Sequence, residues 1–170
     1  MATVSAPNRS IIAWLFIVGG VLQIIGAVVA LIPSGGNVGA IYAISNLAIG
    51  IAFVLMAAWF ASSTIARVAY VIAAVGWLLL ALTSLINVPI LGTLGLFVAA
   101  VGSIFAGIVV YSGKVFSERA NVTFLVAMIL GAVNLLLSQV GGLPSLFGTV
   151  IVILFGAALI GAGVLSLRRQ

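Results

Sequence analysis

The chain contains no cysteine and no histidine, and its only acidic residue is Glu118. Without thiols, imidazoles or paired carboxylates, it offers no disulfide, no thiolate nucleophile and no ligand set for a transition metal. Only 4% of its residues are charged, whereas soluble globular domains carry about 25%. Because 65% of the residues are hydrophobic and the mean hydropathy is +1.52, the composition excludes a soluble globule and indicates an integral membrane protein.

Six long apolar runs account for most of the chain, and each has about the 20 residues that a helix needs to cross the hydrocarbon core of a bilayer. The segments between them are too short to fold independently. We therefore predict an all-α polytopic protein in which residues 1–170 form a single six-helix transmembrane domain. The predicted spans are 11–32, 40–60, 68–87, 92–112, 120–138 and 146–167.

All lysines and arginines lie in alternate gaps between these runs, at Arg9, Arg67, Lys114, Arg119, Arg168 and Arg169. The other three gaps carry no charge. Short basic loops stay in the cytoplasm during membrane insertion, so both termini are predicted to be cytoplasmic. Amphipathic rings settle at the headgroups, and four of them lie near the predicted cytoplasmic helix ends: Trp14, Trp59, Tyr70 and Tyr111.

A proline turn follows each odd-numbered run, at Pro33, Pro89 and Pro144, which are almost evenly spaced. Proline disfavours helix in the residue before it, and the glycines nearby permit a tight reversal. The pattern predicts three consecutive helical hairpins that are closed on the outer face. The alternative is that each short turn between membrane helices selects proline and glycine independently.

Catalytic chemistry has little support in these residues. The one Ser–Lys candidate is Lys114 with Ser112 or Ser117, but such a lysine must be desolvated, and this one lies in a polar loop near Glu118. A charged loop that fixes topology is the better interpretation. We expect no enzyme activity, no catalytic residue, no cofactor and no metal site. The dispersed cations form no basic patch, so we also expect no nucleic-acid partner.

Neutral polar residues at membrane depth are the remaining candidates, at Gln23, Asn46, Thr83, Ser84, Asn134 and Ser138. Gln23 and Asn134 lie the same number of positions before their hairpin prolines, so repeated hairpins would place them at equal depth. Carboxamides there either form hydrogen bonds between helices or line a path for an uncharged solute. Trp77 lies near the middle of the third run, where it either fills the core or stacks on a substrate.

Two pairs of segments resemble the HdeD-type small acid-resistance membrane proteins, a family built from two-helix repeats. They are 32–36 with 47–51, and 143–145 with 155–157. The resemblance implies the plasma (inner) membrane of a bacterium and a role in stress response or envelope maintenance. It assigns no catalytic residue.

Two functional hypotheses follow. The first is a non-catalytic integral membrane protein, an accessory subunit or envelope stress-related protein that acts through helix packing. Its partners would be the lipid bilayer and either other membrane protein subunits or further copies of itself. The second is a channel or transporter for a small neutral solute, lined by Gln23, Asn46 and Asn134.

Overall fold

The computed structural model describes residues 6–32, 38–86, 88–138 and 145–167. Helices are the only regular elements in the described part of the chain, and all six are long and apolar enough to cross a membrane. The predicted fold class is thereby confirmed. The helices are α1 Ala6–Val29, α2 Gly39–Trp59, α3 Thr64–Thr83, α4 Pro89–Gly113, α5 Glu118–Leu137 and α6 Ser145–Leu167.

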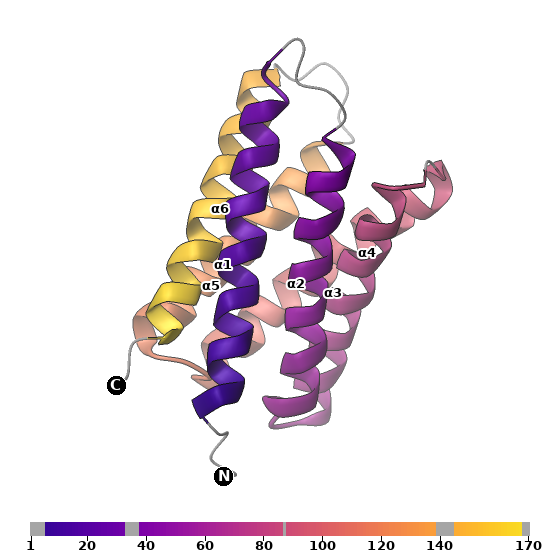
Figure 1. The fold of residues 1–170 in the computed structure, drawn as a ribbon. Coiled ribbons are helices and arrows are strands. Elements are labelled where there is room, and N and C mark those ends of the chain that lie inside the picture. The colour runs from indigo at the N-terminus through magenta and orange to yellow at the C-terminus, as the bar shows by residue number, and fades with distance from the viewer. Residues whose placement is uncertain (1–5, 33–37, 87, 139–144, 168–170) are drawn as a thin grey trace.

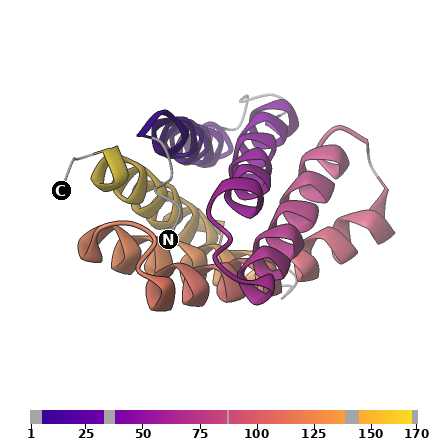
Figure 2. The ribbon, with the colours of Figure 1, turned by 90° about the horizontal axis from the view of Figure 1, so that it is seen from below.

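The six helices form a closed ring in chain order (Figures 1 and 2). Each helix packs against the one before it and the one after it, and α6 packs against α1 to complete the ring. The hairpins α1–α2, α3–α4 and α5–α6 turn at one end of the bundle, here called the turn end. The opposite end, which holds the α2–α3 and α4–α5 connections, is called the basic end (Figure 1).

All six helices begin before their predicted spans, and at α3 and α5 the start is marked by a side chain that caps the helix. Ser63 accepts a hydrogen bond from the backbone N–H of Ala66, and α3 therefore begins several residues before its apolar run. Ser117 caps α5 in the same way through Ala120. Pro89 is the first residue of α4, where its missing N–H costs nothing. Pro33 and Pro144 lie outside the described residues.

Every described cation lies at the basic end: Arg9, Arg67, Lys114 and Arg119. Arg168 and Arg169 are outside the described residues. Trp14 and Tyr111 are exposed on the surface of the ring, as expected for rings at the headgroups. Tyr70 is completely buried. Its face of α3 packs into the ring, so its side chain does not face the surrounding lipid.

Close backbone approaches at glycines hold the ring together. A Cβ placed on Gly20 of α1 would lie 2.5 Å from the carbonyl oxygen of Gly156 on α6. Between α3 and α4, a Cβ on Gly76 would collide with the backbone of Ala99. Small residues at such crossings permit dense interhelical packing, which matters because lipid provides no hydrophobic drive for helix association.

Candidate functional site: a carboxamide-lined cavity

A cavity of about 400 Å³ occupies the interior of the ring at the turn end. We call it the vestibule. Among the described residues, its walls come from every helix except α4. Along α3 it extends from Ser84 to Trp77, a helical rise of about 10 Å. Its lining residues are Gln23, Ala27, Ala30, Tyr42, Asn46, Trp77, Leu80, Ser84, Asn134, Leu135, Ser138, Gly148, Thr149, Val152 and Phe155.

The three carboxamides predicted from the sequence all line this one cavity. Gln23 comes from α1, Asn46 from α2 and Asn134 from α5, although more than a hundred positions of sequence separate the first from the last. The closure of the ring between α6 and α1 brings α5 close enough for this convergence. The spacing of Gln23 and Asn134 from their hairpin prolines predicts equal depth, and the structure adds the shared cavity.

Gln23 and Asn46 are bonded to each other. The Gln23 Nε2 group donates to Asn46 Oδ1 at 3.0 Å, and both side chains are nearly fully buried. This bond satisfies one donor and one acceptor. Each carboxamide has two donor hydrogens and an oxygen that can accept twice, so the pair keeps polar capacity toward the vestibule.

Asn134 is half-buried, and its side chain makes no hydrogen bond within the described part of the chain. The nearby hydroxyls behave differently. Ser84 donates to the carbonyl of Leu80 at 2.7 Å, and Ser138 donates to the carbonyl of Leu135 at 2.6 Å. These hydroxyls therefore face the vestibule mainly as acceptors, while the Asn134 amide can both donate and accept.

The floor of the vestibule is an aromatic pair. The rings of Trp77 and Phe155 stack with centroids 5.7 Å apart and an angle of 13° between their planes. The indole N–H of Trp77 donates to the Ser103 hydroxyl of α4 at 3.0 Å. Phe155 lies against Gly131, where a Cβ would come within 2.8 Å of its ring. Trp77 is thus a core residue whose edge also reaches the cavity.

Toward the basic end the interior is filled by further aromatic rings. Phe16, Phe53 and Phe124 contact one another edge to face, with centroids 5.2 to 6.1 Å apart. All three are buried, and none lines the vestibule. Phe116 and Phe60 extend this cluster toward the basic end. Within the described part of the chain, the vestibule therefore ends at these rings as a blind cavity and does not continue as a pore.

Two polar contacts were missed by the sequence reasoning. Ser45 is completely buried and donates to the carbonyl of Gly19 at 2.8 Å, which joins α1 and α2 one residue before Asn46. Ser103 of α4 is the hydrogen-bond partner of Trp77. Two sequence features could have indicated these contacts. Ser45 directly precedes a carboxamide in a membrane span, and Ser103 lies on a helix face of small residues that can approach another helix closely.

The other sequence candidates lie apart from the vestibule's polar wall. Thr83 donates to the carbonyl of Leu80. Near the end of α4, Ser112 donates to the carbonyl of Val109, and Ser117 caps α5, so within the described residues neither hydroxyl is bonded to Lys114. A search of the described residues found no cluster of three or more metal-binding side chains.

Comparisons with models of protein families, with curated proteins and with solved structures found no match for this chain.

Proposed function

We propose that this non-catalytic integral membrane protein binds a small uncharged molecule in the vestibule. The observation that carries the proposal is the convergence of Gln23, Asn46 and Asn134 on one cavity of about 400 Å³. Polar groups at membrane depth are costly unless they have partners, and a polar solute would supply the partners that Asn134 lacks among the described residues.

The chemistry of the walls defines the ligand class. No charged side chain lines the vestibule among the described residues, so an ion would have no countercharge. Carboxamides and hydroxyls present both donors and acceptors, while the aromatic floor is apolar. A small neutral molecule with hydrogen-bonding groups, of the size of a polyol or an amide, fits this lining.

The blind floor favours binding over open conduction. Passage across the membrane would need Trp77 and the rings beneath it to move, as in a carrier with alternating access. The channel version of the transport hypothesis requires a continuous path, and the Phe16, Phe53 and Phe124 cluster occupies the interior where that path would run. We therefore place solute binding before solute conduction in the proposal.

Trp77 offers a direct test, because the chain has only three tryptophans. With Trp14 and Trp59 replaced by phenylalanine, the fluorescence reports Trp77 alone. Acrylamide is a small neutral amide that quenches tryptophan on contact. We expect it to quench Trp77 through the vestibule, and we expect glycerol or urea to reduce the quenching by competition.

Gly148 and Gly92 provide a matched pair for this assay. Each is the fourth residue of its helix, and among the described residues a Cβ at either position would meet no atom closer than 4.0 Å. Only Gly148 lines the vestibule. Gly148→Phe should lower the quenching of Trp77 by filling the cavity, and Gly92→Phe should not. Equal quenching in the two variants would refute a solute-accessible vestibule.

Helix packing favours a second candidate function, that of an accessory subunit or envelope stress-related protein. The specific observation is the buried Gln23–Asn46 bond, which is also what a purely structural pair between helices would form. Gentle extraction of the native protein, followed by mass spectrometry, tests this candidate. A stoichiometric membrane partner would support it, whereas recovery of this chain alone would favour the solute-binding proposal. The bacterial inner-membrane location and the role in stress response belong to this same proposal.

A further inference from the structure

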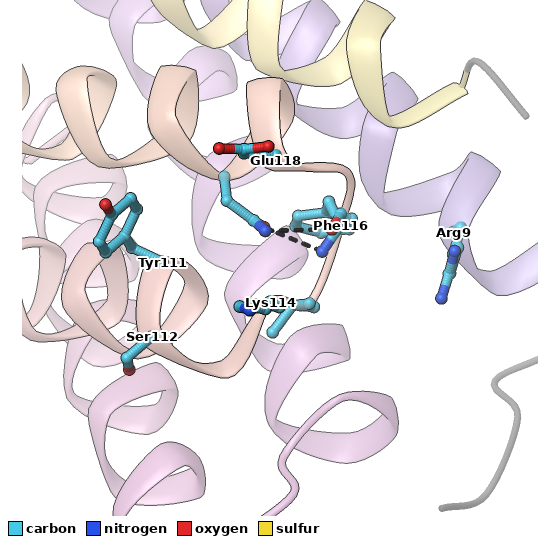
Figure 3. A pocket seen from close by; sticks show the side chains of 8 residues that line it. Arg9, Tyr111, Ser112, Lys114, Phe116 and Glu118 are labelled. Carbon is cyan, nitrogen blue, oxygen red and sulfur yellow. Dashed lines mark hydrogen bonds between the residues drawn. The ribbon is translucent and has the colours of Figure 1, made fainter. Parts of the chain in front are cut away.

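A second cavity, of about 600 Å³, lies at the basic end, on the opposite side of the aromatic core from the vestibule. Figure 3 shows the residues that line it. The α4–α5 loop and the adjoining helix ends form most of it, and α1 contributes Arg9. Its lining residues are Arg9, Tyr111, Ser112, Lys114, Val115, Phe116, Glu118 and Asn121. We call it the basic-end cavity.

Two cations from distant parts of the chain line this cavity. Arg9 belongs to the first turns of α1, and Lys114 follows the last residue of α4. Figure 3 shows them on different sides of the cavity, with Glu118 toward α5. Among the described residues no ion pair joins Glu118 to a cation. Because two cations and one carboxylate are among the lining residues, the lining of the cavity has a net positive charge.

The loop that carries Lys114 is held in a fixed conformation. The Asn121 side chain accepts from the Phe116 N–H at 2.9 Å and donates to the Phe116 carbonyl at 3.0 Å. Lys114 itself has φ 50°, the only positive φ of a non-glycine residue among those described. A glycine would adopt this conformation more readily, so the lysine is present at a position where the backbone favours another residue.

The position of the cavity along the helix axes indicates which anion it would meet. It lies where α4 ends and α5 begins, level with the helix ends that carry the exposed Tyr111. Membrane phosphates are concentrated at this depth. An arginine guanidinium matches the geometry of a phosphate oxygen pair, and a lysine ammonium adds a compact charge.

We propose that the basic-end cavity binds a phosphate group, with Arg9 and Lys114 as its cationic ligands. The phosphate belongs either to the headgroup of an anionic lipid or to a small soluble phosphate. Arg67 lies at the same end of the protein but does not line the cavity. Arg67 is therefore a control position. Its substitution separates binding in the cavity from the general attraction between surface cations and an anionic surface.

The experiment measures binding of dihexanoyl phosphatidylglycerol to the full chain in a neutral detergent, by native mass spectrometry. Dihexanoyl phosphatidylcholine is the zwitterionic control, and inorganic phosphate is the soluble competitor. Arg9→Gln and Lys114→Gln should each weaken phosphatidylglycerol binding about fivefold, the value of one interfacial cation. Arg67→Gln, which removes the same charge at the same end, should leave the affinity nearly unchanged.

Two further variants serve as controls. One separates a loss of binding from a loss of folding, and the other tests whether a negative charge in the cavity weakens anion binding. Lys114→Gly retains the backbone conformation at φ 50° without strain, so lost binding in this variant does not reflect misfolding. Glu118→Gln removes the one negative charge of the cavity and should strengthen binding. Displacement of the lipid by millimolar inorganic phosphate would assign the site to a soluble phosphate.

Two results would overturn the inference. One is an equal loss of phosphatidylglycerol affinity in Arg9→Gln, Lys114→Gln and Arg67→Gln, which would show that the lipid responds only to the overall surface charge. The other is equal binding of the phosphatidylcholine control. Neither result bears on the vestibule, which shares no lining residue with this cavity.

Discussion

Gln23 and Asn46 are joined by a hydrogen bond of 3.0 Å between α1 and α2, at the edge of a cavity inside the ring. This bond has both a structural and a functional consequence. It stabilises the first hairpin, and it orients two carboxamides toward the same space. Asn134 reaches that space from α5 and completes the polar wall.

The Gln23–Asn46 bond predicts energetic coupling between the two positions. Gln23→Met and Asn46→Leu keep the side-chain volumes similar, and each should cost about 1 to 2 kcal/mol because it leaves the other amide without its partner. The double variant should cost less than the sum, with a coupling energy of about 0.6 to 1.7 kcal/mol. Unfolding in mixed detergent micelles measures all four proteins. Strict additivity would show that the bond contributes nothing.

The close approach of Gly20 and Gly156 predicts that one added methyl group disturbs the packing of α1 against α6 and lowers the stability of the protein. Gly20→Ala places its Cβ against the carbonyl of Gly156 on the facing helix, and we expect a loss of about 1 to 3 kcal/mol from overpacking. Gly92→Ala is the control, because its Cβ would meet only Thr83 at 4.0 Å. The control should be neutral or slightly stabilising. The same unfolding assay applies, and equal stability of the two variants would contradict the observed helix contact.

The buried hydroxyl of Tyr70 leads us to expect that its removal stabilises the protein. Its ring is fully buried, and its hydroxyl has no hydrogen-bond partner among the described residues. Tyr70→Phe removes the unpaired group and keeps the ring, so the protein should become more stable by about 1 kcal/mol. Tyr111→Phe, on the exposed surface, should change stability little in the absence of lipid. A thermal unfolding shift to lower temperature for Tyr70→Phe would indicate that the hydroxyl does have a partner.

The absence of cysteine allows a clean test of the predicted topology. Ser62→Cys places one thiol in the exposed α2–α3 connection at the basic end, and Val88→Cys places one in the α3–α4 connection at the turn end. A membrane-impermeant maleimide added to intact cells should label Cys at position 88 and leave position 62 unlabelled. After permeabilisation, both should react. The reverse pattern would place the basic end outside and contradict the cytoplasmic termini.

Much of this protein follows from its sequence because the bilayer imposes simple rules. A helix must satisfy its own backbone in hydrocarbon, so each long apolar run becomes one span. Short connections then force the chain to reverse, which places Arg9, Arg67, Lys114 and Arg119 at the same end. The helix starts were less predictable, since α3 and α5 begin at the serine caps Ser63 and Ser117 and not at a change in hydropathy.

The order of the helices around the ring was decided only by the tertiary structure. Lipid surrounds every apolar face equally well, so hydropathy does not specify which faces meet, and close approaches such as Gly20 to Gly156 select the neighbours. For the same reason the sequence named Gln23, Asn46 and Asn134 without placing them together. Closure of α6 onto α1 brings these residues to one cavity, and the aromatic rings beneath them make it a blind one.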